Sequence, residues 1–219
     1  RDNEEVNKFW MCDDGMMTYT RQDTDRLLMS TEGRGEERMP VGEDEALALA
    51  AEKLKSIDGA QLAVVLSAQH STEDNLALAK LASALGAKSL YLAALDAWEG
   101  DDILRSDDRN PNRAGATQAA GGADLKALAE LAEDVQTGSV QAVLALGWAS
   151  AEKLEELAPL AGLDAVISLT SHVGPLPAVA SVAIAVADTF EIDGSFVNAK
   201  GMSQAFGPVL PAPAVVLSA

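Results

Sequence analysis

Five short apolar runs, none of which alternates polar and apolar residues, constrain the fold of this chain most. They lie at residues 62–66, 89–92, 140–146, 165–169 and 182–186. A strand with one face in water alternates, whereas a strand covered on both faces is apolar throughout, as in parallel sheets. Stretches with helical spacing separate the runs. This order, with right-handed crossovers, predicts an α/β fold in which helices flank a doubly wound, mostly parallel sheet.

The helical stretches have recognisable ends. Residues 45–57 place apolar side chains at the spacing of one helix face. Ser71 is a good N-cap for a helix that Gly86 would stop. Further helices are expected at residues 124–135 and 151–160, with an irregular stretch over 101–122. Beyond the last apolar run, the residues predict a turn, a short strand at 196–197 and a second turn.

The first part of the chain differs in composition from the rest. Residues 1–29 are polar and lack helical period, although residues 17–20 favour a short strand. Residues 30–42, rich in Gly, Glu and Arg, are typical of a linker. We therefore expect an N-terminal segment over residues 1–42, partly irregular or β-containing, and an α/β domain over residues 43–219.

Charge and hydropathy exclude several classes of partner. The formal net charge is −18, from 34 acidic and 16 basic residues. Nucleic-acid binding requires a basic surface, so no nucleic-acid partner is expected. No apolar run reaches the roughly 20 residues that span a bilayer, so direct membrane insertion is not expected either. The single cysteine, Cys12, excludes an internal disulfide.

A doubly wound sheet binds ligands at the carboxyl ends of its strands. The loops expected there are residues 67–72, 95–101, 147–150 and 170–175. Ser71, Thr72 and Ser150 stand where backbone N–H groups at a helix start could hold a phosphate. The simpler interpretation, which we prefer, is that these hydroxyls only cap their helices. No loop has a dinucleotide-binding glycine pattern or a P-loop lysine.

Both histidines follow predicted strands. His70 and His172 are therefore candidates for a ligand contact or a general base. Neither has a neighbour at metal-ligand spacing, and no nucleophile-elbow motif is present. Loop histidines that cap backbone groups are the favoured interpretation.

Three separated segments carry a family resemblance. Residues 6–15 contain the pattern V-N-x-x-W-x-C-D-x-G. This pattern resembles a stretch of the large iron–sulfur subunit of respiratory NADH:quinone oxidoreductase (complex I), a member of the molybdopterin oxidoreductase family. Residues 107–116 are similar to that subunit's A-D-x-N-P-N-x-x-G-A loop, and residues 187–204 to the family's E-x-D-G-T-F-x-N-x-E-G-R-x-Q segment.

The resemblance gives Cys12 a role. In related molybdopterin oxidoreductases the matching cysteine is the fourth ligand of a [4Fe–4S] cluster. A cubane cluster needs three further thiolates, which this chain does not supply. Cys12 would thus be a cluster ligand only in a longer parent protein. The chain is expected to be an excised piece that begins just inside such a cluster region.

Departures from the pattern argue against molybdenum chemistry. Met16 stands where arginine is usual after the first motif, and Met202 replaces the arginine of E-G-R. Losing an arginine removes a bidentate contact to an anion. The resemblance therefore implies the molybdopterin oxidoreductase fold without molybdenum catalysis.

Three hypotheses for function follow. The leading one is a non-catalytic structural domain of a subunit like the large iron–sulfur subunit of complex I, without a cofactor of its own. Its partners would be other subunits of an NADH dehydrogenase complex, and it would be cytoplasmic and peripheral to the inner membrane. The second is a fragment of a formate dehydrogenase-like molybdopterin enzyme in which Ser71, Thr72 and Asn110 contact part of a pterin cofactor. The third is a small-molecule-binding α/β module unrelated to respiration.

Overall fold

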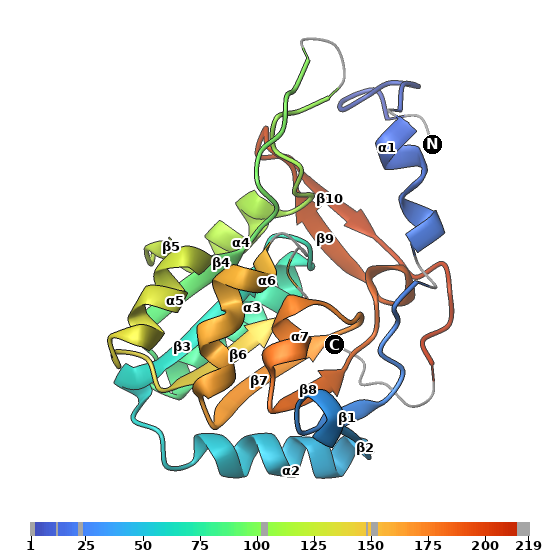
Figure 1. The fold of residues 1–219 in the computed structure, drawn as a ribbon. Coiled ribbons are helices and arrows are strands. Elements are labelled where there is room, and N and C mark those ends of the chain that lie inside the picture. The colour runs from blue at the N-terminus through green and yellow to red at the C-terminus, as the bar shows by residue number, and fades with distance from the viewer. Residues whose placement is uncertain are drawn as a thin grey trace.

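A computed structural model describes residues 3–11, 13–21, 24–101, 105–147, 149 and 153–213. The chain forms an α/β fold with one eight-stranded, mostly parallel sheet and a separate two-stranded hairpin (Figure 1). The sheet order is β2-β1-β8-β7-β6-β3-β4-β5. The expected fold class is therefore confirmed.

Six parallel strands form the body of the sheet. They are β3 (Leu62–Ser67), β4 (Ser89–Ala93), β5 (Leu125–Ala127), β6 (Ala142–Leu146), β7 (Ala165–Thr170) and β8 (Val182–Ala185). From β3 the chain moves outward through β4 and β5, then returns to place β6 on the other side of β3. The strand order therefore reverses between β3 and β6, which makes this pair the topological switch point of the sheet.

Helices cover both faces because adjacent residues in each strand point to opposite sides. On one face Val64 and Leu144 pack in a core with α2 (Glu43–Leu54) and α3 (Thr72–Ala84). On the other face Val65 and Val143 pack in a second core. That core also contains residues of α5 (Leu128–Gln136), α6 (Leu154–Leu157), η5 (Ala158–Gly162) and α7 (Pro175–Val179).

The five predicted apolar strands are confirmed, and the local signals at α3 act as expected. Ser71 caps α3 in a capping box with Asp74: the Ser71 hydroxyl accepts from the Asp74 N–H, and the Asp74 carboxylate accepts from the Ser71 N–H. Gly86 has a φ of +77°, the left-handed conformation that ends helices and that glycine adopts without a steric cost.

The N-terminal segment differs from expectation in two places. Residues 17–20 do not form a strand, because their backbone bonds are local and build the short helices α1 (Asp13–Met16) and η1 (Thr18–Arg21). Residues 30–42 are not an unstructured linker. They supply β1 (Ser30–Glu32), which pairs antiparallel with β8, and β2 (Met39–Val41), with η2 (Gly35–Glu37) between them.

Three more elements were absent from the sequence-based expectation. Helix α4 (Arg113–Ala119) lies within the stretch expected to be irregular. Residues 125–127 form β5 before α5 begins, so that predicted helix starts four residues later than expected. After η6 (Thr189–Glu191), the predicted strand β9 (Gly194–Val197) gains an antiparallel partner, β10 (Ser203–Phe206).

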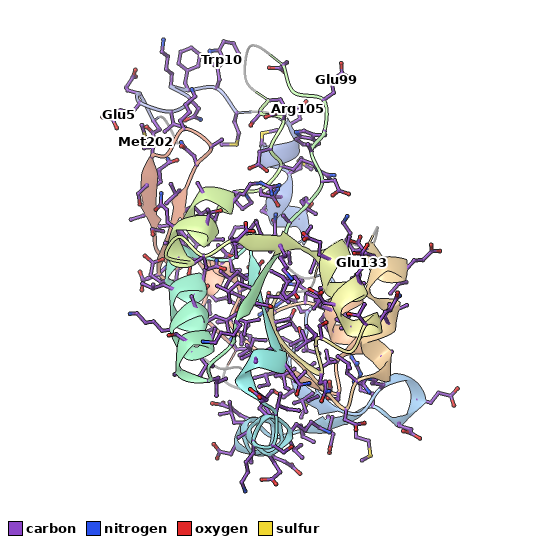
Figure 2. The ribbon with its side chains drawn as sticks, turned by 90° about the vertical axis from the view of Figure 1, so that its left-hand side faces the viewer. Glu5, Trp10, Glu99, Arg105, Glu133 and Met202 are labelled. Atoms are coloured by element: carbon purple, nitrogen blue, oxygen red, sulfur yellow. The ribbon has the colours of Figure 1, made fainter. Side chains whose placement is uncertain are left out.

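The hairpin and the first part of the N-terminal segment, around α1, lie toward the end of the molecule away from α2, whereas β1 and β2 lie beside α2 (Figure 1). The long loop after β4 also reaches the end away from α2, where its Glu99 and Arg105 lie near the level of Trp10 and Met202 (Figure 2). Within the described residues, none of the helices combines the length and apolar character needed to cross a membrane.

Candidate functional site

A cavity of about 460 Å³ lies beyond the carboxyl ends of β3, β7 and β8. Its walls come from three regions of the chain: the N-terminal segment, the loops after the parallel strands, and the hairpin. The described lining residues are Thr18, Thr24, Asp25, Gln69, Pro111, His172, Val173, Asp188, Thr189, Phe190 and Phe196. The cavity therefore occupies the edge of the sheet where doubly wound folds bind ligands.

His172 is held by a short hydrogen-bonded chain. Its Nδ1 lies 2.9 Å from the Ser171 hydroxyl oxygen, and that hydroxyl donates to Asp188 Oδ2 over 3.1 Å. Asp188 Oδ2 also lies 3.5 Å from His172 Nδ1. Since the Ser171 proton is used by Asp188, the hydroxyl oxygen accepts the Nδ1 proton. We therefore assign a proton to Nδ1, which donates to Ser171.

A buried ion pair joins the N-terminal segment to this cluster. Arg26 Nη2 lies 2.9 Å and 2.8 Å from the two carboxylate oxygens of Glu191, and the two side chains are only 8 % and 5 % exposed. Arg26 Nη1 also donates to the Ser171 carbonyl over 2.8 Å, and Glu191 accepts from the Asp188 N–H. The pair thus fixes the segment that carries Asp25 beside the loop that carries His172.

His70 lies beside the topological switch point and is almost fully buried. Its Nδ1 is 3.0 Å from the Ser67 hydroxyl. Burial lowers the pKa of His70 and outweighs the nearby carboxylates of Asp74 and Asp188, so the ring is neutral at pH 7. Gly147, with a φ of +90°, packs against it: a Cβ there would approach the His70 ring to 2.8 Å. Among the described residues, the ring of each histidine bonds to a hydroxyl, of Ser67 or Ser171, and not to a backbone group.

The side chains of the predicted cofactor contacts are engaged within the protein. Ser71 caps α3, and Thr72 Oγ1 donates to the Ser195 carbonyl over 3.0 Å. Asn110 accepts at Oδ1 from the Leu95 N–H and from Gln69 Nε2, each over 2.8 Å. Its Nδ2 donates to the Leu95 carbonyl. A pterin-binding role for Ser71, Thr72 and Asn110 stays a prediction.

Two of the three resemblance segments meet at Asn112. This fully buried side chain accepts at Oδ1 from the Val197 N–H over 2.7 Å and donates from Nδ2 to the His70 carbonyl over 2.8 Å. Gly115 packs directly above it, because a Cβ there would lie 2.1 Å from the Asn112 oxygen. Asn112 thus joins the loop before α4 to β9 and to the loop after β3.

Glu73, on the first turn of α3, holds the hairpin from the other side. Its two carboxylate oxygens accept from the Ser195 N–H and hydroxyl, each over 2.8 Å. Partial burial works to raise the pKa of Glu73, but these hydrogen bonds outweigh it and hold the pKa below the usual glutamate value. The hairpin is therefore fixed on the starts of α3 and α4.

Several predicted positions lie outside the described residues, among them Cys12 and Ser150. In the part of the chain that the structure describes, no group of three or more His, Cys, Asp or Glu side chains could hold a metal ion. The role of Cys12 as a cluster ligand in a longer protein stays a prediction.

Sequence reasoning found His172 and the loop after β3, but it missed Asp25, Asp188 and Phe190. Asp188 follows β8 closely, so the carboxyl-end rule could have identified it. The same rule reaches Phe190 in η6, two residues later. Asp25 carries no local signal, because only the tertiary fold brings the N-terminal segment to this edge. A scan of known protein families found no match, and no curated protein matched the sequence.

Proposed function

We propose that this chain is a non-catalytic structural domain of a subunit like the large iron–sulfur subunit of NADH:quinone oxidoreductase. Electrons would pass through clusters in other parts of that subunit and in its partners. In the longer parent protein, Cys12 would complete a [4Fe–4S] cluster. The domain would lie on the cytoplasmic side, peripheral to the inner membrane through its partner subunits.

One observation carries this proposal: residues of the resemblance segments are used to join loops of the fold. Asn112, from the second segment, binds backbone groups of β9 and of the loop after β3, and Asn110 binds both backbone groups of Leu95 at the far end of its own loop. Ser195, from the third, binds Glu73 and Thr72 of α3. Polar groups satisfied within the protein stabilise its architecture and are not free for chemistry. The arrangement supports a structural role for these segments.

The N-terminal segment supports a role in assembly. Between residues 9 and 19, six large apolar side chains are about half or more exposed: Phe9, Trp10, Met11, Met16, Met17 and Tyr19. Exposed aromatic and methionine side chains gathered on one segment are typical of protein–protein contact. In this proposal they contact the neighbouring subunits of the peripheral arm.

Co-purification from native membranes tests the proposal. The genomic copy of the gene is tagged, and the protein is isolated in mild detergent. We expect NADH dehydrogenase subunits and NADH:ferricyanide reductase activity to elute with it. A variant with Phe9→Ser and Trp10→Ser should lose these partners, whereas the control Leu154→Ser, an exposed leucine on α6, should keep them. Recovery of the wild-type protein alone, or with stoichiometric molybdenum, would contradict the proposal.

The position and size of the cavity keep a second candidate in view, a pterin-binding fragment of a molybdopterin enzyme, although Ser71, Thr72 and Asn110 are not among the described lining residues. The cavity lies where doubly wound folds bind cofactors, and its volume falls in the range of small-molecule sites. Oxidation and fluorescence of an extract of freshly purified protein would reveal a bound pterin. One equivalent of pterin per chain would replace the structural proposal with this one, and a non-fluorescent extract would remove the second candidate.

A further inference from the structure

The polar lining of the cavity includes two carboxylates, on Asp25 and Asp188. Asp25 is exposed, and its carboxylate makes no hydrogen bond or ion pair with any described residue. The His172 ring presents its Nε2 edge, because its Nδ1 faces Ser171 and Asp188. Gln69 has a side-chain oxygen and a second amide N–H beyond the one that donates to Asn110. A ligand that satisfies the Asp25 carboxylate must donate hydrogen bonds, because an ionised carboxylate only accepts them.

The charge of the lining has one sign. Asp25 and Asp188 are carboxylates, and the described lining residues include neither lysine nor arginine. The guanidinium of Arg26, the residue after Asp25, is already neutralised by its bidentate pair with Glu191 and is almost fully buried. An anion placed here would meet repulsion without a compensating cation, whereas a cation would gain attraction.

Two phenyl rings supply the apolar walls. Phe190 lies in η6, directly after the Asp188 cluster, and Phe196 lies on β9. The Phe196 ring packs against Phe206 of β10, with ring centroids 4.7 Å apart, which holds its orientation. Aromatic rings stack on flat ligands and attract cations through their electron-rich faces.

We propose that this cavity binds a small, flat aromatic cation whose N–H donors face Asp25, beside the His172 ring, and whose ring contacts Phe190 and Phe196. An amidinium or a protonated aminoheterocycle has this chemistry. The assignment depends on the lining alone and does not rest on the structural role of the domain. Failure of one proposal therefore leaves the other standing.

Benzamidine and benzoate form a matched pair of probes, because they share a ring and differ in the sign of charge. The chain has only two histidines, so NMR of the imidazole carbons gives one signal in the cavity and one beside Ser67. A His172→Gln variant assigns them. We expect millimolar benzamidine to shift the His172 signal progressively and to leave the His70 signal largely in place, and benzoate to shift neither.

The contact between benzamidine and the Asp25 carboxylate is tested against an exposed carboxylate outside the cavity. Asp25→Asn should weaken benzamidine binding roughly tenfold or more, the size of one charge-assisted hydrogen bond. Glu52→Gln removes the same charge from the solvent-exposed face of α2 and should leave the affinity unchanged. The proposal is overturned if benzamidine does not move the His172 signal, if benzoate binds equally well, or if both variants weaken binding alike.

Discussion

The side chain of Asn112 joins three parts of the chain: the loop before α4, the loop after β3, and β9. Replacing Asn112 with alanine would leave the buried N–H of Val197 and the carbonyl of His70 without partners. An unsatisfied buried polar group costs about 1–3 kcal/mol, so we expect N112A to lower the free energy of unfolding by about 2–5 kcal/mol. Urea denaturation followed by circular dichroism measures this change.

Asn3→Ala is the control for that experiment. Asn3 accepts from the Glu5 N–H on the exposed N-terminal segment, where water can replace the lost bond. We expect a change within about 0.5 kcal/mol. Equal effects of the two substitutions would show that Asn112 does not join the loops.

Single residues could be interpreted from the sequence only where their partner is local. The capping role of Ser71 was predictable because its partner, Asp74, is three residues away. Asn112 stands in a recognisable motif, but its partners Val197 and His70 lie 85 and 42 positions away. No sequence pattern encodes those pairings, so the motif alone did not reveal that its asparagine joins three loops.

Among the elements, the stretch around Arg26 is joined to η6 by one buried ion pair, Arg26 with Glu191. Breaking a buried pair by removing one partner leaves an uncompensated charge and typically costs about 3–5 kcal/mol. In Arg26→Gln we expect the segment to detach from η6. Amide exchange should then accelerate at Leu27 and Val173, whose N–H groups bond to Ser171 and Asp25 across this junction. Amides of β3 and β6 should keep their protection.

The exposed pair of Lys55 and Glu52 is the comparison for Arg26. Its side chains are 74 % and 76 % exposed, and such surface pairs contribute little. Lys55→Gln should therefore change no exchange rate outside α2. If Arg26→Gln behaves like Lys55→Gln, the segment is held by other contacts.

An element was predictable where its own residues specify its structure. It was missed where packing against a neighbouring element specifies it. The buried strands β3, β6 and β7 are apolar along their length, so their composition alone identified them. Helix α4 has the sequence RAGATQA, without an apolar stripe, and packs closely on α3 through Gly115. Strand β10 alternates its burial and is stable only beside β9.

For the whole molecule, the sequence indicates the edge of the sheet at which a cavity should lie but not the walls that close it. The carboxyl-end rule selected the loops after β3 and β7. The other walls come from the first 25 residues and from η6, which the sequence alone could not bring together. Strands β1 and β2 precede the expected domain boundary at residue 42, yet they belong to the same sheet as the strands of the main domain.

A three-membered network makes the stability of the whole fold depend on pH at both ends of the scale. Asp134 on α5 accepts from the Tyr91 hydroxyl of β4 over 2.6 Å and from Lys126 of β5 over 2.8 Å. These bonds hold the pKa of Asp134 below its usual value and raise that of Lys126. Burial, aided by Asp134, raises the pKa of Tyr91.

The signs follow from linkage between proton binding and folding. A lowered carboxyl pKa stabilises the fold above the unfolded value near 4, and this contribution is lost as pH falls through the folded pKa. A raised tyrosine or lysine pKa stabilises the fold below unfolded values near 10, and this contribution is lost as pH rises through the folded pKa.

Asp134→Asn should therefore lower the free energy of unfolding at pH 7. It should also make that free energy depend less steeply on pH at the acidic and the alkaline end. Glu133→Gln removes the same charge from the next residue, outside the network, so it should keep the wild-type shape. The measurement is the urea midpoint of unfolding at a series of pH values. If the midpoints of Asp134→Asn and Glu133→Gln change with pH in the same way, net charge alone sets the pH dependence.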